Sequence, residues 1–153
     1  MEKKLKKSLG QNLLYDKNIR NKIITYSNLE NKKILEIGPG EGFLTDGILK
    51  QHPKKLILIE KDKMFYNKLL KKYNKFKNVE VYNDDALFIN YKKFINYNII
   101  SNLPYNISTK LIIKIFKHNI NFNELVLMVQ KDVAKKLDYK KGKMNKYKFI
   151  VKL

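Results

Sequence analysis

The sequence alternates short apolar runs with segments of helical periodicity, and this alternation constrains the fold more than any other feature. Apolar runs bounded by turn residues predict buried strands, and apolar residues recurring every three or four positions predict helices. The predicted strands are 33–37, 56–60, 79–82, 98–101 and 124–130, with 147–151 as the start of a sixth. The predicted helices are one that follows residue 16, then 43–51, 62–73, 107–116 and 131–137. This order predicts an α/β fold with a parallel sheet and right-handed crossovers.

One predicted helix, 62–73, shows how these segments pack. Asp62 can cap its first turn, and Phe65, Leu69, Leu70 and Tyr73 share a face that we expect to lie against the sheet.

Length and composition set outer limits. A chain of 153 residues fits a single domain, 1–153. It has no cysteine, which excludes disulfides, thiolate zinc sites and cysteine nucleophiles. Its two histidines, His52 and His118, lie at predicted helix ends, and no metal-ligand spacing is present. The longest strictly apolar run, 125–129, is far too short for a membrane span, and no signal peptide is evident. We therefore expect a cytoplasmic protein with no metal and no membrane partner.

The formal net charge is +19. Such an excess attracts a polyanion such as RNA. It is equally explained by codons rich in A and T, because lysine, asparagine, isoleucine and tyrosine are all abundant. Since the lysines are spread along the whole chain, charge alone does not favour RNA.

A glycine turn follows the first predicted strand. Gly38, Gly40 and Gly42 alternate there after the acid Glu36, in the sequence EIGPGEG. The nicotinamide-binding fingerprint would need a further glycine at position 43, which is phenylalanine. A turn of this type brings the backbone close to a ligand, although an ordinary strand-to-helix turn explains it almost as well.

Acids end the next two predicted strands. Glu60 can accept hydrogen bonds from both hydroxyls of a ribose, and Asp85 can accept from an adenine amine. A helix cap and an Asx turn are the ordinary alternatives for the two residues. The carboxyl ends of parallel strands meet at one edge of a sheet. The acids and the glycine turn together therefore predict a nucleoside pocket.

The tetrapeptide Asn102-Leu103-Pro104-Tyr105 follows the fourth predicted strand. Methylation of an adenine amine requires its lone pair to be turned out of conjugation with the ring. The amide oxygen of Asn102 and a neighbouring backbone carbonyl can each accept one N–H and so position the nitrogen. Pro104 stiffens the turn, and Tyr105 offers a ring on which an extruded base can stack. The alternative is a plain Asn-x-Pro loop with a surface tyrosine.

Taken in order, the motifs resemble one family, the ribosomal RNA adenine dimethyltransferases, and most closely their small-subunit type. The resemblance covers residues 6–137. Its motifs are KSLGQNLL at 7–14, EIGPGEG at 36–42, IEKD at 59–62, NDDAL at 83–87, NLPYNIST at 102–109 and LVLMVQKDVAKKL at 125–137.

This resemblance implies a Rossmann-like (class I) methyltransferase sheet that uses S-adenosyl-L-methionine. It implies transfer of two methyl groups to each of two adjacent adenosines in a hairpin loop of small-subunit rRNA, so that the partner is the small ribosomal subunit. It also implies that the target base leaves its stack to react. Carried over to this chain, the cofactor contacts Asn12 and Leu14 in an N-terminal segment, 1–15, and then Gly38, Glu60, Asp85 and Asn102. The residues that hold the adenine are Asn102, Leu103, Pro104 and Tyr105.

The resemblance weakens after residue 137. Family members continue with the rest of the sheet, a Phe-x-Pro-x-Pro-x-Val motif and a small helical domain, and the sequence contains none of these. We expect a sheet truncated after about five or six strands with no C-terminal helical domain. A sheet that ended at strand five would have an open edge. A fragment, a shortened gene product and half of a site completed by another chain all remain open.

Three other functions remain as alternatives. A non-catalytic rRNA-binding assembly factor would keep the fold and lose turnover. The large-subunit enzymes of macrolide resistance usually carry isoleucine in place of Leu103 and lack a stretch like 130–134, and so rank second. DNA adenine methyltransferases usually have proline in place of Leu103 and rank lower.

Overall fold

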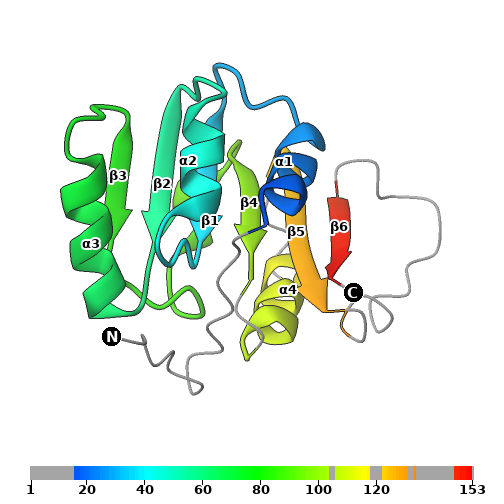
Figure 1. Cartoon of the computed structure of the whole chain (residues 1–153). Helices are drawn as coiled ribbons and strands as arrows, with labels where there is room; N and C mark the ends of the chain where they lie inside the picture. Colours follow the sequence, from blue (N-terminus) through cyan, green and yellow to red (C-terminus); the bar gives the residue numbers. More distant parts are fainter. Residues whose placement is uncertain (1–15, 104–105, 118–121, 131–132, 134–146, 153) are drawn as a thin grey trace.

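In the computed structural model, which describes residues 16–103, 106–117, 122–130, 133 and 147–152, six strands form one parallel sheet. The strand order is β3-β2-β1-β4-β5-β6, and all the arrows in Figure 1 point toward the same edge. The strands are β1 (Lys33–Ile37), β2 (Lys55–Ile59), β3 (Val79–Tyr82), β4 (Asn98–Asn102), β5 (Glu124–Gln130) and β6 (Tyr147–Lys152).

Helices cover both faces of this sheet. They are α1 (Lys17–Thr25), α2 (Phe43–Leu49), α3 (Lys63–Tyr73), the 3₁₀ helix η2 (Tyr91–Phe94) and α4 (Ser108–Lys117). Helices α1, α2 and α3 lie on one face, toward the viewer in Figure 1, whereas η2 and α4 pack against the other. Aspartates begin two of them. The side chain of Asp16 accepts the backbone N–H of Asn18 at 2.7 Å, and that of Asp62 accepts the N–H of Met64 at 2.8 Å.

Two apolar layers sandwich the sheet. Successive side chains of a strand point to opposite faces. Ile34 and Leu56 therefore pack with α1–α3, while Leu35 and Ile57 pack with η2 and α4. The unbroken apolar runs of the sequence follow from burial on both faces, as predicted.

Most of the predicted elements are confirmed. Strands 33–37, 79–82 and 124–130 have the predicted bounds, and the other boundaries differ by one or two residues. The prediction for Leu70 is wrong, because it is 40 % exposed while Phe65, Leu69 and Tyr73 are buried. These three recur every four residues, and Leu70 lies about 100° around the helix from Leu69. The edge of β5 is paired with β6. The predicted helix 131–137 lies outside the described residues except for position 133.

The crossover from β3 to β4 contains no α-helix, and aromatic packing, which was not predicted, takes its place. The ring of Tyr91 meets that of Phe122 edge-on at 6.1 Å, and Phe94 meets Tyr97 at 5.6 Å. The Tyr91 hydroxyl donates to the carbonyl of Ala86 at 2.8 Å. This packing therefore fixes the loop that follows β3.

Candidate functional site

The order of the strands makes β1 and β4 neighbours, and their carboxyl ends are the place where open α/β sheets bind ligands. The chain leaves β1 for α2 on one face of the sheet and leaves β4 for α4 on the other, which makes this a topological switch point. The hydroxyl of Ser101 donates to the carbonyl of Ile37 at 2.5 Å. Because Gly38 and Asn102 are the next residues, the glycine turn and the end of β4 lie side by side, as predicted.

The glycine turn depends on left-handed backbone conformations. Gly38, Gly40 and Gly42 have φ values of 66°, 59° and 82°. A β-carbon at Gly42 would also collide with the Tyr73 hydroxyl, which lies 2.9 Å from the carbonyl oxygen of Gly42 and 2.8 Å from Asp46 Oδ1. Burial, with Asp46 nearby, raises the pKa of Tyr73 well above its usual value. Sequence reasoning placed Tyr73 in the core but missed this contact with the turn.

Glu60 is buried, with 7 % of its surface exposed, and is not a solvated acid. Its Oε2 accepts the backbone N–H of Gly40 at 3.0 Å, and its Oε1 accepts that of Asp62 at 2.8 Å. Burial raises the pKa of Glu60, and the two N–H groups offset part of that rise. One carboxylate thus joins the glycine turn to the start of α3.

Asp85 lies in the loop after β3. Its Oδ1 accepts the backbone N–H of Leu87 at 2.9 Å, which forms the Asx turn named above as the alternative, and its Oδ2 accepts a hydrogen bond from Lys61 Nζ at 2.8 Å. Burial acts to raise the pKa of Asp85, but the hydrogen bonds from Lys61 and Leu87 outweigh it and lower the pKa. Sequence reasoning missed Lys61, although it stands directly after Glu60.

The end of β4 contributes Asn102 and Leu103. Asn102 is half-buried at the last position of the strand. Leu103 is 1 % exposed and packs into the core, and its N–H donates to Met128 O at 3.3 Å. The side chain of Leu103 is therefore part of the core and is not available to a ligand. The predicted site residues Asn12, Leu14, Pro104 and Tyr105 lie outside the described residues.

Glu36 is buried directly beneath the glycine turn. The Thr45 hydroxyl donates to its Oε2 at 2.7 Å. Burial, together with the charges of Asp46 and Glu60, raises the pKa of Glu36 from 4.5 to about 8. The carboxyl group is therefore mostly protonated at neutral pH.

This pKa predicts a pH dependence of stability. Between pH 4.5 and about 8 the folded protein keeps a proton on Glu36 that the unfolded chain has lost. The contribution of Glu36 to the free energy of unfolding is thus complete below pH 4.5. It falls as the pH rises through this window, by at most about 1.4 kcal/mol per pH unit. We expect Glu36→Gln to reduce the decline in stability between about pH 5 and pH 8, as measured by urea unfolding. Identical pH profiles for variant and wild type would contradict the prediction.

The remaining candidates add nothing to the site. His52 is exposed just beyond α2, with φ of 51°, and His118 lies outside the described residues. In the part of the chain that the structure describes, no cluster of three or more potential metal ligands occurs. Within the same part, no helix is long and apolar enough to cross a membrane.

This parallel sheet, with a glycine turn after β1 and acids after β2 and β3, defines a Rossmann-like methyltransferase fold. The chain belongs to the ribosomal RNA adenine dimethylase family, whose model matches residues 2–149.

Named relatives agree with this assignment. "Ribosomal RNA small subunit methyltransferase A" of Mycoplasmopsis synoviae is 42 % identical over 153 residues, which are 99 % of this chain and 58 % of the relative. The protein of that name from Pelagibacter ubique is 42 % identical over 88 % of this chain and 52 % of its own length. The chain therefore spans about half the length of the relatives it matches.

Two solved structures share the fold. A dimethyladenosine transferase from Plasmodium falciparum has a TM-score of 0.71 and 34 % identity, over 84 % of this chain and 47 % of that one. The 23S rRNA methyltransferase ErmE also has a TM-score of 0.71, with 26 % identity over 82 % of this chain and 50 % of that one.

Proposed function

We propose that this chain takes part in S-adenosylmethionine-dependent dimethylation of the N6 amines of adenosines in a hairpin loop of small-subunit rRNA. The observation that supports it most is the Ser101–Ile37 hydrogen bond, which sets Asn102 beside the glycine turn. A cofactor pocket and an amine-binding residue then share one crevice. We further propose that residues 1–153 form one domain, with segment 1–15 contributing Asn12 and Leu14 to the cofactor.

The residues at the strand ends fit S-adenosylmethionine chemically. Glu60 offers a buried carboxylate for ribose hydroxyls, and Asp85, which is half-buried, offers a carboxylate for an adenine amine. The backbone of the turn at Gly38 can approach the ligand closely. Asn102 completes the proposed set of cofactor contacts. When bound, the cofactor supplies a methyl group from its sulfonium centre.

The proposed role of Asn102 is to position the target amine. Its side-chain oxygen accepts one amine N–H while a backbone carbonyl of the same turn, at Leu103 or Pro104, accepts the other. The nitrogen then presents its lone pair to the methyl group without a strong base. In this proposal Pro104 stiffens the turn and Tyr105 stacks on the extruded adenine, which is worth about 1–3 kcal/mol.

The choice of the small subunit rests on the relatives named above. The test is incubation of the full chain with radiolabelled S-adenosylmethionine and either unmethylated small subunits or large subunits. We expect label in small-subunit rRNA only. Label in the large subunit alone would favour the macrolide-resistance type. Subunit binding without label, beside a working control enzyme, would favour the non-catalytic assembly factor.

Replacing Glu60 with glutamine should weaken cofactor binding about tenfold, which corresponds to about 1.4 kcal/mol. The glutamine amide would face one of the two backbone N–H groups, of Gly40 or Asp62, that Glu60 now accepts. Calorimetric titration with S-adenosylhomocysteine measures the effect. Glu30→Gln, at an exposed loop position, is the matched control. Equal affinities of Glu60→Gln and wild type would remove Glu60 from the cofactor site.

A further inference from the structure

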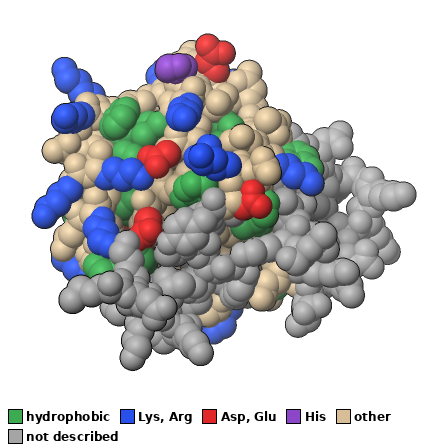
Figure 2. All heavy atoms as spheres, viewed as in Figure 1, with side chains coloured by type: hydrophobic (Ala, Val, Ile, Leu, Met, Phe, Trp, Pro, Cys, Tyr) green, Lys and Arg blue, Asp and Glu red, His purple; other side chains and the backbone are tan. Residues whose placement is uncertain are grey.

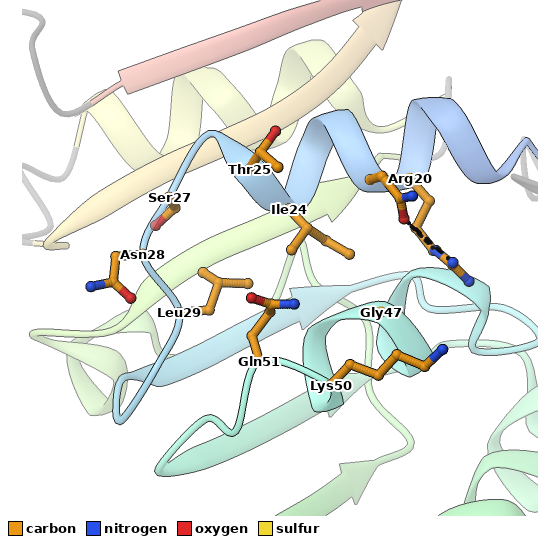
Figure 3. Close-up of a pocket in the computed structure, with 10 residues that line it drawn as sticks. Arg20, Ile24, Thr25, Ser27, Asn28, Leu29, Gly47, Lys50 and Gln51 are labelled. Atoms are coloured by element: carbon orange, nitrogen blue, oxygen red, sulfur yellow. Dashed lines mark hydrogen bonds between the residues drawn. The ribbon is translucent and has the colours of Figure 1, made fainter.

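A pocket of about 370 Å³ lies between α1 and α2, on the face of the sheet that they cover (Figure 3). Its floor is apolar, with Ile24 and Leu29 buried and Gly47 on α2. Of the described residues that line it, Arg20 and Lys50 are charged and none is an acid. The volume lies within the range of small-ligand sites, roughly 300–1,000 Å³. The pocket is therefore a positively charged recess with room for a ligand.

Arg20 is held in one orientation. A β-carbon at Gly47 would lie 3.0 Å from Arg20 Cδ, so the arginine stem rests on the glycine. The guanidinium carbon lies 4.7 Å from the centroid of the Phe43 ring, in the position of a cation–π contact. Two of its nitrogens have only long contacts, of 3.4 Å, with the side-chain oxygen of Asn21. A guanidinium group, whose N–H donors form a planar fork, loses little entropy on binding an anion when it is held in this way.

Arg20 is also the one arginine among the 33 lysines and arginines of the chain. In a sequence whose other cations are all lysine, general attraction of a polyanion does not require an arginine. The planar fork differs from a lysine ammonium in binding two oxygens of a phosphate at once. Because Arg20 lies in a recess beside Lys50, its guanidinium group is suited to bind one particular phosphate group.

The lining chemistry fits the backbone of RNA better than a free nucleotide. Among the described residues that line the pocket, none is aromatic and could stack a base, and none is a carboxylate that could hold ribose hydroxyls. Amide and hydroxyl groups, such as those of Asn28, Gln51 and Thr25, bind phosphate and sugar oxygens without reading sequence. Phe43, against which Arg20 packs, directly follows the glycine turn. The pocket thus begins close to the proposed active site.

We propose that the α1–α2 pocket binds a phosphodiester–ribose unit of the RNA substrate, with Arg20 and Lys50 holding the phosphate. The proposal rests on the proposed function for the identity of the polymer. It assigns to this face a discrete contact that anchors the RNA strand away from the reacting adenosine.

General electrostatics is the main competing explanation. Figure 2 shows lysine and arginine side chains scattered over the visible face, with few acids among them. The test therefore compares losses of equal charge at two places. Lys50→Gln removes a cation from the pocket at an exposed position. Lys75→Gln removes one from an exposed position beyond α3. Arg20→Lys keeps the charge and removes the fork.

The measurement is fluorescence anisotropy of a labelled RNA hairpin with two adjacent adenosines in its loop, over a range of salt concentrations. We expect Lys50→Gln to weaken binding roughly 5- to 10-fold at about 0.1 M salt and to lower the salt slope by about 0.9. Arg20→Lys should weaken binding about threefold or more with an unchanged slope. Lys75→Gln should change affinity less than about twofold. Affinity for S-adenosylhomocysteine and thermal stability should not change in Lys50→Gln.

Three outcomes would overturn the pocket assignment. Equal losses in Lys50→Gln and Lys75→Gln would show diffuse attraction only. Unchanged RNA binding in both pocket variants would remove the site. Binding of AMP or inorganic phosphate that depends on Lys50, with RNA binding unaffected, would identify a free-nucleotide site instead. Failure of the wild type to methylate RNA that it binds through Lys50 would contradict the proposed function and leave the pocket intact.

Discussion

Replacement of Asn102 by alanine is expected to lower the rate of methyl transfer at saturating cofactor by roughly 10²–10³-fold. The expectation follows from its position at the last residue of β4, where Ser101 ties the strand to the residue before the glycine turn. Alanine keeps the backbone of the turn and removes the oxygen that would orient the amine. The affinity for S-adenosylhomocysteine should change by less than about threefold, because Glu60, Asp85 and the turn remain.

Single-turnover methylation and calorimetric titration measure the two quantities separately. Asn67→Ala, which removes an exposed asparagine from α3, is the matched control and should change neither. Equal losses in rate and affinity would assign Asn102 to cofactor binding alone and contradict the positioning role.

The second large effect concerns stability. Gly42→Ala should lower the free energy of unfolding by about 2–4 kcal/mol. Part of the cost is backbone strain, because φ at this residue is 82°. The rest is steric, because the new methyl group would collide with the hydroxyl of Tyr73, which reaches the turn from the end of α3. Urea unfolding followed by circular dichroism provides the measurement.

The two parts of this cost can be separated in a Tyr73→Phe background. With the hydroxyl removed, two ring carbons would still lie 3.0 and 3.1 Å from the new β-carbon, so we expect Gly42→Ala to cost the backbone part, about 1–2 kcal/mol, and a smaller steric part. The same cost in both backgrounds would show that the contact with Tyr73 contributes nothing. Tyr73→Phe by itself serves as the reference for loss of the hydrogen bonds to Gly42 and Asp46.

Periodicity and turn chemistry predicted most of the fold because the strands are buried on both faces and two of the helices begin at aspartate caps. The order of the strands could not be predicted from these patterns. Only the structure shows that β1 and β4 are neighbours, although many residues separate them in the sequence. The glycine turn, Glu60 and Asp85 were predictable as a group because parallel strands end at one edge. Their hydrogen-bond partners within the protein were not predicted, since Gly40 and Lys61 meet these acids only in three dimensions.

The misses have particular causes. Leu70 was predicted to share the buried face because it follows Leu69. Consecutive residues of a helix point in directions about 100° apart, so Leu70 points away from the core. The 3₁₀ helix η2 is too short for an apolar period to develop, so no element was predicted around Tyr91. Nothing in the sequence singles out Arg20 as a binding residue, because its contacts with Phe43 and Gly47 join two helices and exist only in the folded chain.

The aromatic packing between β3 and β4 has a consequence for how ligand affinity can vary. Tyr91 supports the carbonyl of Ala86, and Ala86 directly follows the carboxylate proposed to bind adenine. The proposed contact between Asp85 and the adenine therefore depends on how the rings pack on the sheet face opposite α1–α3. Substitutions that loosen the packing of those rings should lower ligand affinity and thermal stability together. Neither property could then change without the other.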